Sequence, residues 1–385
     1  MQSNSTTFKP DIKGVKIKKV VLNGSNYDVF CVRNDHRDKC CNKKMNIHDY
    51  RTVHIRSLKY NNRSVTLHIK KQRYVCPNCG KKITSSLEII EKNCIISIEV
   101  KKEIKRKLTE MKSLTQISRE ENVSVSTVLR ILEQIIITNK VYNLEEIYLD
   151  EFKGDANGEK YQLAIYDKNH RLVSILKDRK SSTLKAFLNK NKDIIKVVSI
   201  DMFMQFRNTI LSTLHSNVSI VADKYHVIRQ ANWMIRDVRI NLYNSDIKNK
   251  DLKKYWKLIA KNPTSYFTEK QINKLNELRN LNDRFDRAYT LRIEFFEIFN
   301  IRDSVEFSNR LDNLIEKLLL SEIKECIKLG NTLQNWNIEI KNIIKYNINN
   351  GFVEGYNNKI KVIKRIGYGI KKFDNLKKLI QLRIA

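Results

Sequence analysis

Between residues 145 and 226 apolar runs alternate with helical segments, and this order constrains the fold more than any other feature of the chain. Five runs of strand length and composition lie at 147–151, 161–166, 172–176, 195–200 and 218–222. A hairpin-type turn, Asp167-Lys-Asn-His170, separates the second run from the third. Helices are predicted at 181–190 and 203–214, between the later runs. Three strands, a crossover helix and two strand–helix repeats predict an α/β sheet.

Acidic residues stand where three of these strands end. Asp150 and Glu151 close the first strand, Asp201 closes the fourth and Asp223 closes the fifth. The strand order resembles that of ribonuclease-H-like domains, whose first and fourth strands are neighbours, so Asp150 and Asp201 are expected to approach each other. A simpler explanation stands beside this one, because Asp201 and Asp223 precede helices and aspartate is a favoured N-cap. Glu151 is equally compatible with a solvent-facing neighbour of Asp150.

A further acid, Glu354, stands in a strongly basic segment that reads as a helix. Nine Lys or Arg residues follow it and only one acid, Asp374. Helical spacing places Glu354, Asn358 and Lys361 on one face. The residues able to pack on a sheet are Phe352, Tyr356, Ile360 and Ile363. A carboxylate among bases suits a site that holds phosphates around a hydrated divalent cation.

The composition favours a nucleic-acid partner. The 385 residues include 73 Lys or Arg against 42 Asp or Glu, which gives a net charge of +31 and a pI near 9.8. Basic side chains gain free energy on phosphates through counterion release. No apolar run reaches the roughly 18 residues of a membrane span, and the polar N-terminus lacks a signal-peptide core. We therefore expect a cytoplasmic protein, associated with the nucleoid when bound to DNA.

The first ninety residues predict a small β domain with a metal site. Alternation at 15–32 and 52–75 predicts short antiparallel strands. Cys76-Pro-Asn-Cys79 is the half-site of a zinc ribbon, and an odd total of seven cysteines favours a reducing compartment and a metal over disulfides. The expected partners are Cys41 with His36 or Cys40, and Asp38 and Cys31 are further candidates for the fourth ligand. Adjacent cysteines argue against one ion taking both Cys40 and Cys41. The alternative is a vestigial knuckle without zinc.

Residues 97–137 have the pattern of a helix-turn-helix. The first helix has an apolar face formed by Val100, Ile104, Leu108 and Met111. Ser113 is expected to cap a second helix, with Gln116 completing a capping box, and Ser124 to cap a third. The buried residues of the third helix are expected to be Val125, Val128, Leu129 and Leu132. Its solvent face carries Ser126, Thr127 and Arg130, which suit a reader of the major groove. The alternative is a three-helix packing element without a DNA role.

The segment 242–345 is predicted to be entirely helical. Apolar residues recur at three- and four-residue spacing, as in Leu275, Leu278, Leu281, Phe285 and Tyr289. Its expected roles are binding end DNA and dimerisation. Trp256 and Trp336 are expected to be core residues rather than base-stacking ones.

Four motifs carry a resemblance to a known family. They are Leu-Asp-Glu-Phe at 149–152, Ser-Ile-Asp-Met at 199–202, Ala-Asp-Lys-Tyr-His-Val at 222–227, and the Glu354 helix at 353–365. Over nearly its whole length the chain resembles DDE transposases of the ISL-three insertion-sequence family. The family typically has a second Cys-x-x-Cys ahead of the segment matched by His48-Asp-Tyr-Arg51, a spacing that this sequence has lost.

The resemblance implies roles for the acids. Asp150, Asp201 and Glu354 would bind two Mg²⁺ ions, with Mn²⁺ able to substitute, and Asp223 and His226 would be an accessory pair. Either Asp201 or Asp223 is the second triad acid, and its place after the fourth strand favours Asp201. The residues expected to hold the DNA backbone are Asn358, Lys359, Lys361, Lys364 and Arg365.

Together these inferences predict a multidomain α+β protein. The segments are a zinc-ribbon-like β domain (1–92), a helix-turn-helix (95–140), a ribonuclease-H-like α/β catalytic domain (143–241), an all-helical insertion (242–345) and the catalytic C-terminal helices (346–385). The expected function is a DNA transposase that binds the terminal inverted repeats of an insertion sequence. It is expected to catalyse Mg-dependent DNA strand cleavage and strand transfer into target DNA by a DDE mechanism, as a homodimer or higher oligomer. The alternatives are a catalytically inactive DNA-binding repressor and a structure-specific nuclease.

Overall fold

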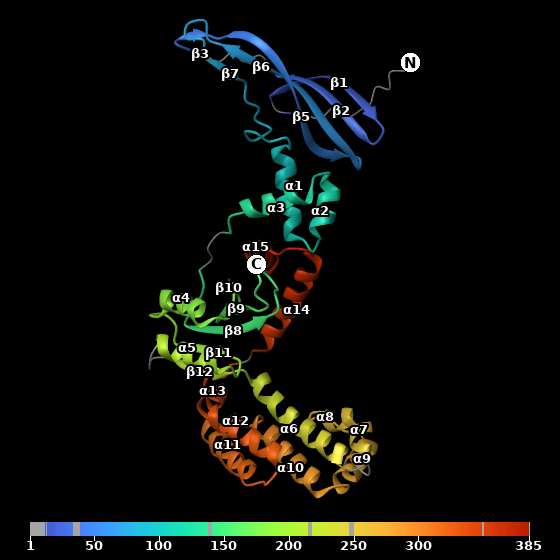
Figure 1. Ribbon diagram of the computed structural model, residues 1–385, viewed down its shortest axis with the longest axis vertical. Coiled ribbons are helices and arrows are strands. Elements are labelled where there is room, and N and C mark those ends of the chain that lie inside the picture. Colours follow the sequence, from blue (N-terminus) through green and yellow to red (C-terminus); the bar gives the residue numbers. More distant parts are fainter. Residues whose placement is uncertain are drawn as a thin grey trace. The chain divides into compact units, whose positions relative to one another are not determined.

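The computed structural model divides the chain into two compact units (Figure 1). It describes residues 12, 14–33, 39–137, 141–214, 218–245, 250–348 and 350–384. One unit contains residues 1–138 and 362–384, and the other contains residues 139–361. Residues 362–384, which the sequence analysis grouped with the catalytic domain, therefore belong to the compact unit that contains the N-terminal segment.

The N-terminal sheet has the strand order β1-β2-β6-β5, with β7 paired to β6. Its strands are β1 (Val15–Asn23), β2 (Asn26–Arg33), β5 (Asn46–Tyr60), β6 (Arg63–Val75) and β7 (Lys82–Thr84). Alternate residues face a core that includes Val29, Ile55, Leu67 and Ile69. Asn61 and Asn62 join β5 to β6 with φ of 46° and 60°, the left-handed backbone that a tight hairpin turn requires.

The prediction of short antiparallel strands is wrong for this sheet in two respects. Strands β5 and β6 have 15 and 13 residues, and β2 pairs with β6 in parallel. The parallel pairing is explained by the cysteine-containing segments that follow the two strands. The chain leaves β2 toward Cys40 and Cys41, and it leaves β6 directly into Cys76, so both strands run toward the cysteines.

Three short helices follow, α1 (Ile98–Thr109), α2 (Leu114–Glu121) and α3 (Val125–Gln134). Ser113 and Ser124 cap α2 and α3 as predicted, but the Gln116 side chain donates to Glu120 rather than completing a capping box. Asn122 ends α2 in the left-handed conformation. Burial differs in detail from the prediction. Val128, Leu132 and Ile131 are buried, Val125 and Leu129 are half-buried, and Met111 is 44% exposed.

Helix α15 (Phe373–Ile384) packs against α1 and α3 as a fourth helix. The Arg383 guanidinium donates to the carbonyl oxygens of Leu108 (3.2 Å) and Lys112 (2.6 Å), at and just beyond the end of α1. Asn375 and Lys372 both donate to the carboxylate of Glu133 in α3. The helix-turn-helix pattern therefore forms a four-helix group with the C-terminal segment.

The sheet of the second unit has the order β10-β9-β8-β11-β12. The strands are β8 (Glu146–Phe152), β9 (Gln162–Asp167), β10 (Leu172–Leu176), β11 (Val197–Ile200) and β12 (Ser219–Ala222). The predicted strands are all present, and the predicted neighbouring of the first and fourth is confirmed by the parallel pair β8–β11. Helices α4 (Ser181–Asn191) and α5 (Met204–Leu214) connect the last three strands.

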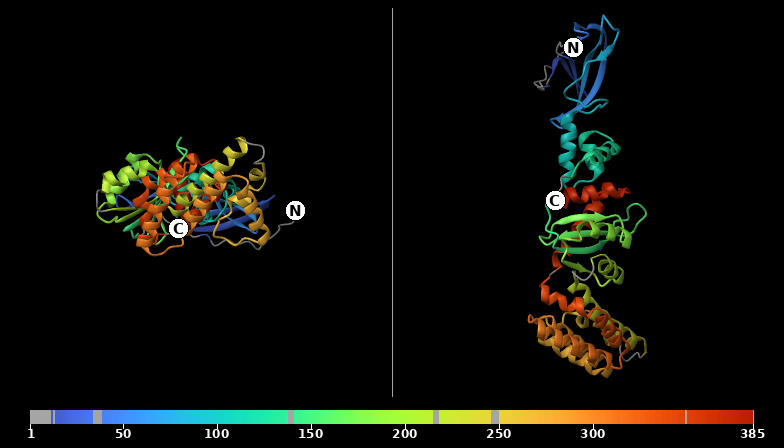
Figure 2. Two further views of the ribbon diagram at one scale, coloured as in Figure 1. Left: turned by 90° about the horizontal axis from the view of Figure 1, so that it is seen from below. Right: turned by 90° about the vertical axis from the view of Figure 1, so that its left-hand side faces the viewer.

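The regular elements in the described part of 224–346 are all helices, joined by short loops. They are α6 (Lys224–Ser245), α7 (Lys250–Lys254), α8 (Trp256–Ala260), α9 (Glu269–Asn280), α10 (Asp283–Ile298), α11 (Ser304–Leu319), α12 (Lys324–Asn335) and α13 (Asn337–Tyr346). Helices α10 to α12 pack beside one another (Figure 2). Leu278, Phe285 and Tyr289 are fully buried as the spacing predicts, whereas Leu281 is exposed. Helix α14 (Gly351–Ile366) follows. None of the described helices is long and apolar enough to cross a membrane.

Candidate metal centres

Five acids line one cavity of about 720 Å³ in the second unit, and Glu151, next to Asp150, is one of them. Asp150 lies in β8, Asp201 follows β11, Asp223 follows β12 and Glu354 lies in the first turn of α14. Strands β8, β11 and β12 are parallel, so their carboxyl ends meet at one edge of the sheet. The structure thus brings together acids that are up to 204 residues apart in the sequence.

Asp201, Asp223 and His226 form the tightest part of this group. One potential ligand atom from each lies within 4.8 Å of the others. His226 Nδ1 lies 3.1 Å from Asp201 Oδ2 and 3.1 Å from Arg229 Nη2. Burial and the Arg229 charge lower the pKa of His226 to about 4, so its imidazole is neutral near pH 7. A neutral imidazole beside carboxylates is a donor set that suits a divalent cation.

Three carboxyl groups of the cavity, those of Asp150, Asp201 and Asp223, are held in an environment that opposes ionisation and raises their pKa values. Burial, followed by the charges of Asp150 and Asp223, raises the pKa of Asp201 to about 8. Burial is also the main reason that the pKa of Asp150 rises to about 6, although a hydrogen bond from Asn357 opposes the rise. The pKa of Asp223 is raised by burial as well. Buried carboxylates that repel one another gain most from a bound cation, so the cavity fits a divalent metal.

Asp223 and Asp201 differ in their other contacts. Asp223 Oδ1 accepts the backbone N–H of Tyr225 at 2.8 Å, so the N-cap explanation holds for this residue. Asn350 also donates to the Asp223 side chain. The carboxylate of Asp201 instead faces the His226 ring. Both acids remain in the same cavity.

Several polar residues that line the cavity were not predicted from the sequence. Asn357, rather than Asn358, lines the cavity, and its amide donates to Asp150 Oδ2. Asn357 lies three residues after Glu354, and this i,i+3 spacing was the available signal. Arg179, which forms an ion pair of 2.9 Å with Glu151, had no comparable pattern.

Helix α14 packs on the sheet through its aromatic residues, and most of its Lys and Arg side chains are exposed. The Phe352 ring meets Tyr148 edge to face at 4.9 Å, and the Tyr356 ring lies 5.1 Å from Tyr166. Lys361 lines the acidic cavity. Among the other predicted DNA-binding residues, Asn358, Lys359 and Arg365 are exposed and Lys364 is half-buried.

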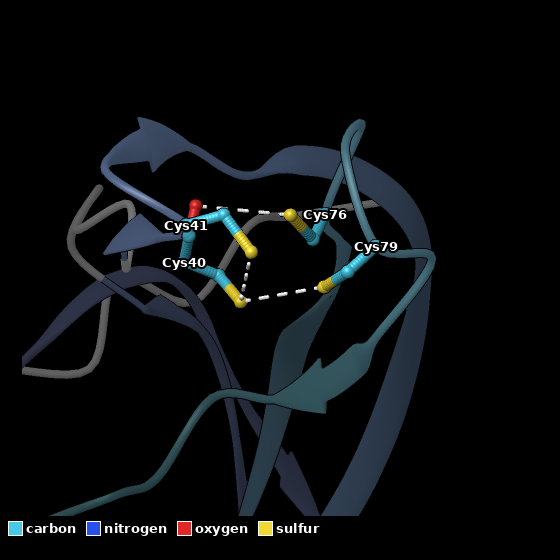
Figure 3. A group of neighbouring side chains, drawn as sticks. All are labelled: Cys40, Cys41, Cys76 and Cys79. Atoms are coloured by element: carbon cyan, nitrogen blue, oxygen red, sulfur yellow. Dashed lines mark hydrogen bonds between the residues drawn. The ribbon is translucent and has the colours of Figure 1, made fainter.

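A second centre is formed by four cysteines in the first unit (Figure 3). The Sγ atoms of Cys40, Cys41, Cys76 and Cys79 all lie within 4.8 Å of one another. Cys40 Sγ is 3.7 Å from Cys79 Sγ and 3.9 Å from Cys41 Sγ. Tetrahedral zinc with Zn–S bonds of ~2.3 Å requires S···S distances of ~3.8 Å. Backbone N–H groups of Cys79 and Asn78 lower the pKa of Cys76 to about 7, which favours the thiolate that a metal binds.

The expectation that one ion would not bind both Cys40 and Cys41 is wrong, because their Sγ atoms lie close enough together to share a ligand sphere. Cys41 and Asn42 adopt φ of 51° and 58° in the turn between β3 (Lys39–Cys40) and β4 (Lys43–Lys44). This left-handed turn brings the neighbouring side chains to the same side. Cys31 is buried in the sheet core instead, and His36 and Asp38 lie outside the described residues.

The predicted reading helix α3 has a polar face. Ser126 and Arg130 are exposed and Thr127 is half-buried. The hydroxyls of Ser126 and Thr127 lie 2.8 and 2.9 Å from that of Ser124, the N-cap. Thr127 and Arg130 line a cavity of about 310 Å³ together with Arg56 of β5. Two arginines, one from α3 and one from β5, therefore line the same cavity.

Comparisons with known proteins identify the chain as a transposase, in agreement with its carboxylate cavity and its cysteine cluster. A family model described as "Transposase", that of the DDE transposases of the ISL-three type, matches residues 147–380. A second model, described as the zinc-finger of transposases IS204, IS1001, IS1096 and IS1165, matches residues 36–79. The chain belongs to the ISL-three family of DDE transposases.

Two curated proteins show different degrees of similarity. The transposase for insertion sequence element IS1001 of Bordetella parapertussis is 23% identical over 350 residues, which cover 87% of this chain and 85% of that protein. A Lactococcus lactis protein named "ATP-dependent protease" is 36% identical over 96 residues, which span only 29% of its length. The ten glycines of the present sequence include no pair five residues apart, so it has no Gly-x-x-x-x-Gly-Lys phosphate loop.

Proposed function

We propose that this transposase binds the terminal inverted repeats of its element and catalyses Mg²⁺-dependent DNA strand cleavage and strand transfer. The observation that carries the proposal is the cavity in which Asp150, Asp201 and Glu354 come together from two strands and a helix. The proposed reaction hydrolyses a phosphodiester at the element's end and then joins the freed 3′-hydroxyl to target DNA.

In this proposal Asp150, Asp201 and Glu354 hold the metal, and Asp223 and His226 support them. Two Mg²⁺ ions bound there would supply Lewis-acid polarisation of the scissile phosphate and activate the attacking oxygen. Asn357 donates to one oxygen of Asp150 and thereby fixes the direction of the other. Lys361 places a positive charge at the same cavity, where it can meet a phosphate oxygen.

The direct test is cleavage of a duplex oligonucleotide that carries the inverted repeat flanking the gene. We expect cutting at the repeat end with Mg²⁺ or Mn²⁺ and none with chelator. Joining of the freed 3′ end to a supercoiled plasmid would demonstrate strand transfer. Binding of the repeat without cutting under every metal condition would favour a repressor and contradict the proposal.

Arg130→Ala should weaken binding to the inverted repeat. Arg130 is exposed on α3, and loss of a base contact costs about 1–3 kcal/mol and relaxes sequence discrimination. Competition gel shifts with repeat and scrambled duplexes would measure both effects. Lys102→Ala, an exposed base on α1, is the matched control and should leave the ratio of the two affinities unchanged. The same unchanged ratio in Arg130→Ala would remove α3 from the reading role.

Replacing Lys359 and Lys361 together by alanine should reduce the salt dependence of DNA binding. Each phosphate contact contributes ~0.9 to the slope of log K against log salt, so the slope should fall by up to about 1.8. Titrations by fluorescence anisotropy between low and moderate salt would give the slope. The control is Lys324→Ala with Lys345→Ala, two exposed lysines of the same unit. A slope equal to that of the control would show that the α14 lysines only solvate the surface.

A further inference from the structure

A second large cavity lies between α6 and α8, outside the acidic one. Its volume is about 720 Å³, and its lining includes Trp233, Tyr243 and Trp256. Trp233 is 39% exposed and Trp256 is 50% exposed. The expectation that Trp256 is a core residue is therefore wrong, whereas Trp336, at 4% exposed, is buried as expected. Two half-exposed indole rings in one cleft form a surface that suits a flat apolar group of a ligand.

The charges around this aromatic cleft point to an anion. Arg236, Arg239 and Lys253 line it, and none of its lining residues is acidic. Asp237, outside the lining, pairs with Arg236 at 2.8 Å, so the charge available to a ligand is that of Arg239 and Lys253. Burial and the Arg236 charge lower the pKa of Arg239. Among the described residues no carboxylate pairs with Arg239. A cleft that combines indole faces with cations matches a nucleotide, in which a flat base is joined to a phosphate.

A buried guanidinium holds together the two helices that line the cleft. Arg292 of α10 is 0% exposed. Its Nη2 donates to Asn232 of α6 at 2.9 Å and to the carbonyl oxygens of Ala260 and Lys261, at the end of α8, at 3.1 Å each. Asn232 and Ala260 both line the cleft. The two helices are thus held apart at a set spacing before any ligand arrives, which lowers the entropic cost of binding.

Helix α6 connects this cleft to the acidic cavity. His226 and Arg229, in its first two turns, line the acidic cavity, and Trp233 lines the cleft. The Arg229 guanidinium lies 4.9 Å from the centre of the Trp233 ring, so one side chain touches both sites. Trp233 lies seven positions after His226, which corresponds to ~10 Å along a helix.

We propose that the cleft between α6 and α8 binds an unpaired nucleobase of the DNA strand, a few nucleotides from the phosphate that is cleaved. The base would stack on Trp233 and Trp256, and its phosphate would meet Arg239 and Lys253. The inference rests on the proposed function, because it takes DNA as the substrate.

The test uses a hairpin duplex with one unpaired 2-aminopurine and the same duplex fully paired, both without divalent metal. The full-length protein should bind the unpaired probe more tightly and quench its fluorescence. Trp233→Ala with Trp256→Ala should lower affinity for the unpaired probe about 5- to 100-fold, remove the quenching and leave the paired duplex bound. Trp256→Phe, which keeps a ring, should retain part of the preference. Tyr266→Ala, a change at an 83% exposed ring outside the cleft, is the control.

Three results would overturn the inference. They are an unchanged preference in the double variant, an equal loss for both probes, or a changed molar mass of the DNA-free variant by light scattering, which would make the cleft an interface between copies. The proposed function fails separately, because it depends on Mg²⁺-dependent cleavage, whereas this assay measures base binding in its absence.

Discussion

Asp150→Asn, Asp201→Asn and Glu354→Gln should each reduce Mg²⁺-dependent strand cleavage by about 10²–10³-fold or more, without loss of repeat binding. The reason is that all three carboxylates line one cavity and share the proposed metal ions. Gel assays of cleavage and gel shifts on the same duplex would separate the two activities. Asp193→Asn, an exposed acid of the same unit, is the control and should cleave normally. Full activity in Glu354→Gln would contradict the proposed mechanism.

Asp223→Ala distinguishes the two candidates for the second acid. As a helix cap and accessory residue it should leave some cleavage, because its carboxylate already accepts the Tyr225 N–H. Complete loss in Asp223→Ala together with full activity in Asp201→Ala would reverse the assignment while keeping the reaction class.

The same Asp201→Asn variant should be more stable than the wild type in the absence of metal. Burial and the neighbouring carboxylates raise the pKa of Asp201 to about 8 in the folded protein, from 3.8 for an aspartate in water. A carboxyl with a raised folded pKa destabilises the fold progressively as pH rises from about 4 to about 8. The stability advantage of the variant should therefore be largest at pH 8 and vanish below pH 4. Urea unfolding across this range would measure it, and added Mg²⁺ should stabilise the wild type more than the variant.

The second large effect is expected at the cysteine cluster. Purified protein should contain one zinc per chain, and Cys40→Ser or Cys79→Ser should lose it, because all four Sγ atoms are placed for one tetrahedral ion. Structural zinc contributes about 10–16 kcal/mol in small domains, so chelation should unfold the strand ends at this site. Elemental analysis and circular dichroism with a chelator would test this.

Cys94→Ser is the control for the zinc experiment. Cys94 is half-buried, lies outside the cluster and accepts a hydrogen bond from Lys101. Its zinc content should equal that of the wild type. Absence of zinc from the wild type, with folding insensitive to chelator, would identify the cluster as a vestigial knuckle.

The sequence predicted those features that depend on local patterns. Strand order in the second unit followed from alternating apolar runs, and the meeting of Asp150 with Asp201 followed from that order. Ser113 and Ser124 were recognisable as caps, because capping is decided within four residues.

Features that depend on tertiary contacts were missed. Trp256 was expected in the core, yet it lines the open cleft between α6 and α8 and remains half-exposed. The grouping of Cys40 with Cys41 depends on a left-handed turn that the sequence does not signal by glycine. The parallel pairing of β2 with β6 required knowing that both strands lead to one cluster.

The last 35 described residues of the chain have a consequence for the order of synthesis. Asn357 binds Asp150, which is 207 residues earlier, and Asn350 binds Ser199, 151 residues earlier. In the other unit, Arg383 binds the end of α1, 275 residues earlier. Neither unit can reach its final packing on the ribosome until residues 350–384 have been synthesised. A chain interrupted before residue 350 would lack both the assembled acidic centre and the support of α15 for α1 and α3. If the proposed function holds, its DNA cleavage and its DNA binding should both be impaired.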